Sequence, residues 1–420
     1  LAQATTLAIF ITIKSLKWEQ PLRAIVSERG IWQKLLGCYL QKHVSSLVLD
    51  DPYRVRNSQE VVRYLEDHNP IGCPVLGIDV VDLYYSIPQS TLLNYVKDCI
   101  TKDNHEDLFT NDSGISVNSF MELLLFYLNS TFVSWGGSLY RQRKGVCIGS
   151  IVTPVLSDIF LAKIGTILSD KLVDLVQTAF RYVDDYLIFL LPSITNRKNP
   201  AELVLSAFKT HGGGLDFTCE VPQQGSLRYL DINITLFPNH VCWEYQPRSV
   251  KPLLNYASCH TKLVKRAIAS SAVSAGLSKS CPHKMTDSVT MQITRLVSAG
   301  FPKSVISSVC EALLRKIKQK QENAGGNKER KRVAVIPYFH NISHGLKKVG
   351  SRYGVDVVLS ALCKVSQICR MTDERLSGIT KKSWTCAVKH INKFVECVVG
   401  VVYMLPLTCG RCCIGQTAVH

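Results

Sequence analysis

Two adjacent aspartates, Asp184 and Asp185, stand between aromatic and branched apolar residues in the segment FRYVDDYLIFL. Burying an unpaired charge costs several kcal/mol, so something must offset the cost of these carboxylates. A strand, a tight turn and a returning strand would present both side chains at the tip of a hairpin. Mg²⁺ prefers oxygen ligands, usually one or two carboxylates together with substrate phosphates. The segment therefore indicates a metal site, with an ordinary surface hairpin as the alternative interpretation.

A third carboxylate, Asp79, lies near the end of the apolar segment VLGIDVV, and Tyr84 follows five residues later. On its own, Asp79 is also consistent with an aspartate that ends a strand or caps a helix. Together with the Asp-Asp pair it would complete a set that holds two metal ions. Two such ions can stabilise both the attacking and the leaving oxygen of a phosphoryl transfer. The three aspartates therefore predict phosphoryl-transfer chemistry.

Hydrophobic patterning predicts the elements that must position these residues. Strands are expected at residues 75–81, 180–183, 186–190 and 227–237, and helices at residues 59–67, 119–128 and 154–176. Thr153 is expected to cap the last of these helices, with Pro154 at its first position. From about residue 247 to residue 321 the pattern becomes helical and basic. A mixed α/β body followed by a helical region is the expected organisation.

Length and composition restrict the class of protein. A chain of 420 residues with 46% hydrophobic and 20% charged residues indicates a globular protein of two or three domains. Its 49 Lys and Arg residues against 33 Asp and Glu residues give a formal net charge of +16. Such a charge suits a polyanion, with nucleic acid the first expectation and an anionic membrane surface the second. No apolar run reaches the roughly 18 residues of a membrane helix, so no membrane span is expected.

The 16 cysteines are scattered, and no signal peptide precedes them, which indicates a reducing, intracellular compartment. The chain opens at Leu1 and stops within an apolar, cysteine-rich segment, so we expect a fragment of a longer protein. The polar stretch at residues 315–332, with Gly325-Gly326 at its centre, is expected to be an exposed helix end followed by a linker.

Three ordered segments, DVVDLYYSIP, YRQRKGVCIGSIVTPVLSDIFL and RYVDDYLIFL, resemble the palm motifs of reverse transcriptases, specifically those of Penelope-like retroelements. The segment PLRAIVSERGIWQKLLGCYLQ is similar to the fingers motif of that family, and LRYLDINI to its primer grip. The match covers most of residues 12–270. It implies an RNA-directed DNA polymerase that extends a DNA primer on an RNA template with dNTPs. Two Mg²⁺ ions, which Mn²⁺ can replace, are the implied cofactors.

The resemblance also implies a right-hand polymerase fold of mixed α/β (α+β) class. Its expected parts are partial fingers at residues 1–75, a palm with an antiparallel sheet at 76–240, a helical basic thumb-like region at 241–320, a linker region at 321–395 and the start of a GIY-YIG endonuclease domain at 396–420.

The family's roles carry over where residues match. Asp79, Asp184 and Asp185 match the catalytic carboxylates; the first two are implied as direct metal ligands, with Asp185 helping to hold the site. Tyr84 matches the position that obstructs a 2′-hydroxyl and so selects deoxynucleotides, although core packing is the alternative role for its ring. Arg23 matches the fingers arginine that meets the triphosphate, which suits a bidentate guanidinium.

Gly145, Gly149 and Ser150 match a loop that lies against the template and the nucleotide, where missing side chains permit close approach. An ordinary loop before a helix is the alternative interpretation. Tyr182 is grouped with the substrate-binding residues. Ile148 departs from the Met that is usual in this loop, and IVTP stands where PLSP is usual, so an inactive, decayed copy stays an alternative.

Lys262, Lys265 and Arg266 are expected to follow the backbone of the template–primer duplex, and a solvated helix face is the alternative. Lys14 and Lys17 are basic neighbours of the fingers motif that are equally consistent with surface lysines.

The C-terminal segment VVYMLPLTCGRCCIGQT resembles the opening of a GIY-YIG endonuclease domain, where Tyr403 matches the tyrosine of the first motif. Cys413 replaces the tyrosine of the second motif, and the chain ends before the Arg and Glu that such nucleases need. Endonuclease activity is therefore not expected. Cys397, Cys409 and Cys412 are either part of a zinc site or buried structural cysteines.

Two other functions compete with reverse transcription. An RNA-dependent RNA polymerase would need room for a 2′-hydroxyl, which Tyr84 opposes. A catalytically inactive, nucleic-acid-binding fragment of a decayed or domesticated element would bind in a salt-sensitive way without incorporating nucleotides. Nuclear residence follows from the chromosomal primer that the resemblance implies. The run NKERKR is either a localisation signal or a solvated linker.

Overall fold

The computed structural model describes residues 6–13, 22–102, 106–196, 199–248, 252–324, 332–339, 342–360, 402–406 and 412–416. The chain divides into two compact units. The first unit contains Leu1–Asn255 and Ala267–Pro302, and the second contains Tyr256–Arg266 and Lys303–His420. None of the helices in the described ranges is long and apolar enough to cross a membrane.

A four-stranded antiparallel sheet forms the centre of the first unit, with the strand order β6-β7-β3-β8. Its strands are β3 (Val75–Val80), β6 (Val176–Tyr182), β7 (Asp185–Leu190) and β8 (Phe217–Glu220). The strands expected at residues 75–81, 180–183 and 186–190 are confirmed. Sequence reasoning did not predict β8, although β8 pairs directly with β3.

Both faces of the two central strands of this sheet, β3 and β7, are buried. In β3 and β7, Ile78 and Ile188 point into a core shared with the helices, whereas Leu187 and Phe189 point into a second core. Successive side chains of a strand point to opposite faces, so a strand covered on both sides needs apolar residues at nearly every position. This explains the uninterrupted apolar run that follows the Asp-Asp pair.

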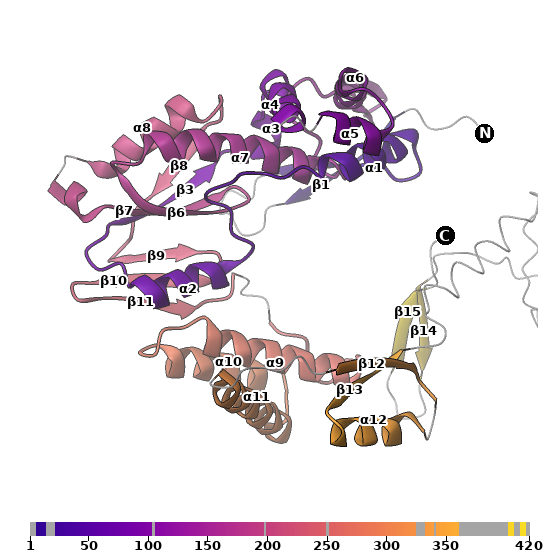
Figure 1. The fold of residues 1–420 in the computed structure, drawn as a ribbon, viewed down its shortest axis with the longest axis vertical. Coiled ribbons are helices and arrows are strands. Elements are labelled where there is room, and N and C mark those ends of the chain that lie inside the picture. The colour runs from indigo at the N-terminus through magenta and orange to yellow at the C-terminus, as the bar shows by residue number, and fades with distance from the viewer. Residues whose placement is uncertain are drawn as a thin grey trace, which may run out of the picture. The chain divides into compact units, whose positions relative to one another are not determined.

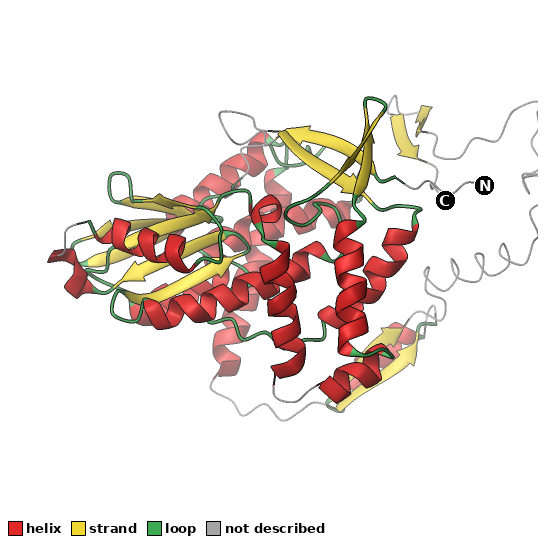
Figure 2. Ribbon diagram, turned by 90° about the horizontal axis from the view of Figure 1, so that it is seen from above, coloured by secondary structure: helices red, strands yellow, loops and turns green. Residues whose placement is uncertain are grey.

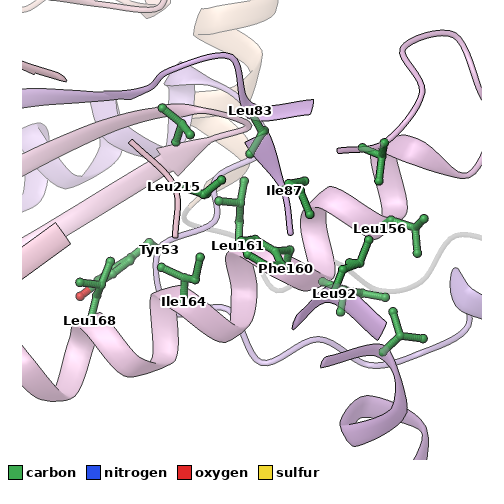
Figure 3. Packing of buried hydrophobic residues seen from close by; sticks show 14 of the residues in the cluster. Tyr53, Leu83, Ile87, Leu92, Leu156, Phe160, Leu161, Ile164, Leu168 and Leu215 are labelled. Atoms are coloured by element: carbon green, nitrogen blue, oxygen red, sulfur yellow. The ribbon is translucent and has the colours of Figure 1, made fainter. Parts of the chain in front are cut away.

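Helices cover one face of the sheet, where α7 and α8 lie along the strands (Figure 1). The helices that contribute buried residues to this core are α1 (Trp32–Val44), α3 (Leu83–Ser86), α4 (Gln89–Thr101), α5 (Glu106–Ser113), α6 (Val117–Asn129), α7 (Thr153–Lys171) and α8 (Pro200–His211). Figure 3 shows Leu156, Phe160 and Ile164 of α7 among the buried side chains of this core. Since α7 packs against the sheet and against α4 and α8, it is apolar on most of its circumference.

A second sheet lies on the opposite side of the first, together with α2 (Ser58–His68) (Figure 1). Its strands β9 (Ser226–Tyr229), β10 (Ile232–Phe237) and β11 (His240–Tyr245) are antiparallel in the order β11-β10-β9. The single strand expected at residues 227–237 is wrong, because the chain turns at Leu230, which has a φ of +51°. β11 also begins at the boundary expected between residues 240 and 241, so this sheet continues across it.

The helix expected at residues 154–176 ends at Lys171, and β6 already begins at Val176. Buried Leu172 ends the helix and accepts hydrogen bonds from the N–H groups of Leu175 and Val176, at 2.9 Å each. Thr153 is not the N-cap, because Val152 occupies that position. Instead the Thr153 hydroxyl donates to the carbonyl of Cys147 at 2.6 Å and ties the preceding loop to the helix.

The rest of the first unit contains two hairpins, a short 3-10 helix and most of a helix pair. The elements are β1 (Ala8–Ile13) with β2 (Leu22–Ser27), β4 (Phe132–Trp135) with β5 (Ser138–Arg141), the 3-10 helix η2 (Pro192–Asn196), α9 (Lys262–Ser278), whose first turn belongs to the second unit, and α10 (Met285–Ser298). The helical region expected after residue 247 is confirmed by α9, α10 and α11 (Lys303–Ala324) of the second unit.

The second unit contains a β-α-β motif of parallel strands, in which α12 lies along β12 and β13 (Figure 2). The motif consists of β12 (Arg332–Pro337), α12 (Ser343–Arg352) and β13 (Val355–Ser360). The stretch expected to be a linker, residues 321–395, therefore contains regular structure. The hairpin of β14 (Val402–Pro406) and β15 (Cys412–Gln416) pairs Tyr403 with Gly415. Cys397 and Cys409 lie outside the described residues.

Candidate metal centre

The structure brings the three predicted aspartates together at one edge of the central sheet. Asp79 of β3 stands directly opposite Asp185, the first residue of β7, and Asp184 lies in the turn between β6 and β7. All three side chains are half-buried, and carboxylate oxygens of the three lie within 4.8 Å of one another. An oxygen cluster of this kind could hold a divalent cation. The hairpin that the sequence predicted is confirmed.

The turn that carries Asp184 is held by a buried arginine. Val183 has a φ of +57°, which β-branched residues rarely adopt, so surrounding contacts must impose this conformation. Arg181 is fully buried, and its Nη1 donates to the Val183 carbonyl at 2.7 Å. Its Nη2 donates to Asp51 in a buried ion pair. Arg181 therefore positions the hairpin tip, a role that sequence reasoning missed.

Electrostatics at the tip disfavour two bare carboxylates. Burial, and then the charge of Asp185, raise the pKa of Asp184 above its usual value, while Arg248 and Arg23 act in the opposite direction. Arg248 donates to the Asp185 carboxylate through Nη2, and its Nε donates to the Leu230 carbonyl at 3.1 Å. A cation bound between the carboxylates would stabilise the ionised form of Asp184 further. Sequence reasoning missed Arg248, although it stands in the segment WEYQPRSVKP, which follows the segment similar to the primer grip after residues 235–242.

The aspartates face a pocket of about 580 Å³. Arg23 of β2, Tyr84 of α3, Ile148 and Arg248 line it together with Thr218. Carboxylates, arginines and an aromatic ring around one cavity suit an anionic ligand that also contacts a metal. Two of the residues expected to bind substrate, Arg23 and Tyr84, thus lie at the pocket.

Comparison with known proteins bears on the fold. No protein-family model and no curated protein matches this chain. Telomerase from Candida albicans, solved with a fragment of telomeric RNA, aligns with a TM-score of 0.50 at 12% identity, over 73% of this chain and 56% of that chain. The fold is that of a right-hand polymerase. The fold class expected from the sequence is confirmed.

Two other solved structures resemble the chain at lower scores. Telomerase from Candida tropicalis gives a TM-score of 0.44 at 13% identity, over 83% of this chain and 57% of that chain. The BmCPV RNA-dependent RNA polymerase at its elongation state gives 0.41 at 12% identity, over 70% and 26% of the two chains. This polymerase-fold chain thus spans little more than half the length of the telomerases.

The glycines of the loop before α7 meet protein backbone. Gly145 has a φ of +70°, and a Cβ there would lie 2.3 Å from the carbonyl oxygen of Tyr84. At Gly149, with a φ of +106°, a Cβ would lie 2.1 Å from the carbonyl oxygen of Val26. Glycine is therefore required at both positions by close approach to α3 and β2. Of this loop, only Ile148 lines the pocket, so a substrate contact for the glycines stays a prediction.

Ser150 and Tyr182 do not line the pocket of the aspartates. Ser150 is buried, shares a hydrogen bond with Tyr127, and accepts one from the Val152 N–H at 3.2 Å. Tyr182 packs against the core beneath β9–β11 and lines a separate pocket that includes Asp231. A substrate contact for either residue stays a prediction.

The basic residues expected to contact nucleic acid belong to the second unit. The Lys265 ammonium lies 4.9 Å from the centre of the Tyr256 ring, and Arg266 donates to the Ser308 hydroxyl at 3.0 Å. Lys262 is exposed at the start of α9. Nucleic-acid binding by these residues stays a prediction, and Lys14 and Lys17 lie outside the described residues.

Proposed function

We propose that this chain is an RNA-directed DNA polymerase of the Penelope-like type, which extends a DNA primer on an RNA template with dNTPs. The observation that carries the proposal is the cluster of Asp79, Asp184 and Asp185 at one edge of a polymerase sheet, facing a pocket with two arginines. In this proposal the protein acts in the nucleus, where a nicked chromosome would supply the primer.

Each residue of the pocket has a role in this proposal. Asp79 and Asp184 would hold Mg²⁺, and Asp185, paired with Arg248, would keep the site in place. When bound, two such ions lower the barrier to attack by the primer 3′-hydroxyl on the α-phosphate and stabilise the departing pyrophosphate. Arg23 would orient the triphosphate through paired N–H donors. Tyr84 would place its ring where a ribose 2′-hydroxyl would otherwise fit.

Primer extension on an RNA template with dNTPs and Mg²⁺ tests the proposal. We expect extension by the wild-type chain and none by Asp184→Asn, because the substitution removes a charged metal ligand. Asp67→Asn, at an exposed position of α2, is the matched control and should extend as the wild type does. A folded wild-type chain that binds the template–primer without extending it would contradict the proposal and indicate a non-catalytic binding fragment.

A further inference from the structure

A second cluster of metal-ligand side chains lies in the first unit, apart from the aspartates. His240 and Cys242 stand on β11, and Cys281 and His283 stand in the segment between α9 and α10. One donor atom from each residue lies within 4.8 Å of the other three. His283 Nδ1 lies 3.0 Å from His240 Nε2 and 3.8 Å from Cys242 Sγ.

The donor set and its spacing fit one particular ion. Zinc in a tetrahedral site has bonds of about 2.3 Å to sulfur and about 2.0–2.1 Å to nitrogen. Such bonds place neighbouring donors roughly 3.3–3.8 Å apart, close to the two distances observed here. Two thiols and two imidazoles favour zinc over Mg²⁺, which prefers oxygen.

Backbone hydrogen bonds hold the two pairs of side chains beside each other. His240 and Cys242 are two residues apart on one strand and therefore point to the same face. The Cys281 N–H donates to the carbonyl of Trp243 at 2.9 Å, which docks the α9–α10 segment on β11. One residue earlier, the buried Ser280 hydroxyl accepts from the Tyr245 N–H at 3.0 Å. The cluster is thus built on fixed backbone.

Burial differs between the two halves of the cluster. Cys281 is completely buried and Cys242 is 6% exposed, whereas His283 is exposed and His240 is half-buried. The thiolates of a zinc site would thus be shielded from solvent, while the imidazole side leaves a path by which the ion can enter. A site with four protein ligands leaves no position for substrate, which is the pattern of structural zinc.

We propose that His240, Cys242, Cys281 and His283 bind one Zn²⁺. The ion fastens β11, the edge strand of the three-stranded sheet, to the segment that leads into α10. Because ligands from distant parts of the chain meet only in the folded state, zinc binding stabilises the first unit. The site is independent of the polymerase reaction proposed above, and it is tested without measuring that reaction.

Zinc content and ligand type in the full chain test the site directly. The wild-type protein, purified with zinc and dialysed, should retain one zinc per chain by elemental analysis. X-ray absorption at the zinc edge should show two sulfur ligands at about 2.3 Å and two nitrogen ligands at about 2.0–2.1 Å. A chain that retains no zinc under reducing conditions, or one whose Cys242 and Cys281 form a disulfide there, would overturn the proposal.

Variants separate this site from other cysteines. His283→Ala changes an exposed side chain, so the protein should fold and lose the retained zinc, whereas His283→Cys should keep zinc with three sulfur ligands. Cys38→Ser, at an exposed thiol of α1, should leave the zinc content unchanged. Cys409→Ser with Cys412→Ser should leave one zinc with two sulfurs and two nitrogens. Loss of all zinc in that double variant would also overturn the proposal.

Discussion

Arg181 shows how a buried charge can position carboxylates that it does not touch. Its guanidinium joins Asp51, 130 positions earlier in the chain, to the carbonyl of Val183 in the aspartate turn. The three aspartates could be predicted because each stands in a short apolar motif. The ion pairs of Arg181 with Asp51 and of Arg248 with Asp185 could not be predicted, because only the tertiary fold brings these partners together.

Breaking the ion pair of Arg181 should be costly. Arg181→Leu leaves the Asp51 carboxylate buried without its partner, and we expect a loss of about 3–5 kcal/mol in the free energy of unfolding. Replacing both residues with leucine should recover much of this loss, because no uncompensated charge is left. Urea denaturation of the single and double variants measures the difference. Equal losses in the two variants would contradict this account.

Asp184 should destabilise the metal-free protein. Its pKa is raised by burial and then by Asp185, so its ionised form opposes folding above the usual carboxyl pKa. In EDTA at neutral pH, Asp184→Asn should therefore melt at a higher temperature than the wild type. The difference should shrink as the pH falls through the raised pKa, because protonation removes the charge of Asp184. A melting temperature unchanged or lowered at neutral pH would exclude this repulsion.

Tyr84 should control the choice of sugar if the proposed reaction is correct. Tyr84→Ala opens the pocket beside Asp184, so incorporation of ribonucleotides should rise relative to deoxynucleotides. Tyr84→Phe keeps the ring and should keep the selectivity. Single-nucleotide extension with rNTPs and dNTPs gives the ratio for each variant. An unchanged ratio in Tyr84→Ala would show that the ring serves core packing instead.

At the scale of elements, the apolar pattern of the sequence predicts a helix or strand correctly when the same face of the element is buried along its whole length. Strands β3 and β7 and helix α2 are nearly as predicted, because each has one apolar pattern along its length, whereas β6 begins at Val176, before the expected residue 180. The expected strand at residues 227–237 fails at Leu230, where a left-handed residue turns the chain between two apolar segments. A left-handed conformation at one leucine does not interrupt the apolar pattern of the sequence. The turn of this hairpin could therefore not be predicted.

Gly149 tests how tightly the loop before α7 packs on β2. Gly149→Ala combines a φ of +106° with a Cβ 2.1 Å from the Val26 carbonyl oxygen, so both strain and a clash result. We expect a loss of more than about 1 kcal/mol in the free energy of unfolding. Gly30→Ala, with a φ of +80° and no atom within 4 Å of its Cβ, is the matched control for strain alone. If the two variants lose the same stability, close packing at Gly149 contributes nothing.

At the scale of the whole molecule, a net charge of +16 favours binding to nucleic acid through its phosphates. Each Lys or Arg side chain that neutralises a phosphate releases counterions from the nucleic acid. The logarithm of the affinity should therefore fall linearly with the logarithm of the salt concentration. The triple variant that replaces Lys262, Lys265 and Arg266 with alanine should make this slope less steep by roughly 2–3, as expected for three lost contacts. Fluorescence anisotropy with a labelled RNA–DNA duplex gives the slope.

A matched change elsewhere distinguishes local contacts from the general effect of charge. A second triple variant removes the same net charge at the exposed basic residues of α12, which are Lys347, Lys348 and Arg352. If the start of α9 contacts phosphates, only the first triple variant changes the slope. Equal changes in both variants would indicate that binding depends on the total charge of the protein. If neither variant changes the slope, the start of α9 is a solvated helix face on which Lys265 contacts Tyr256 and Arg266 contacts Ser308.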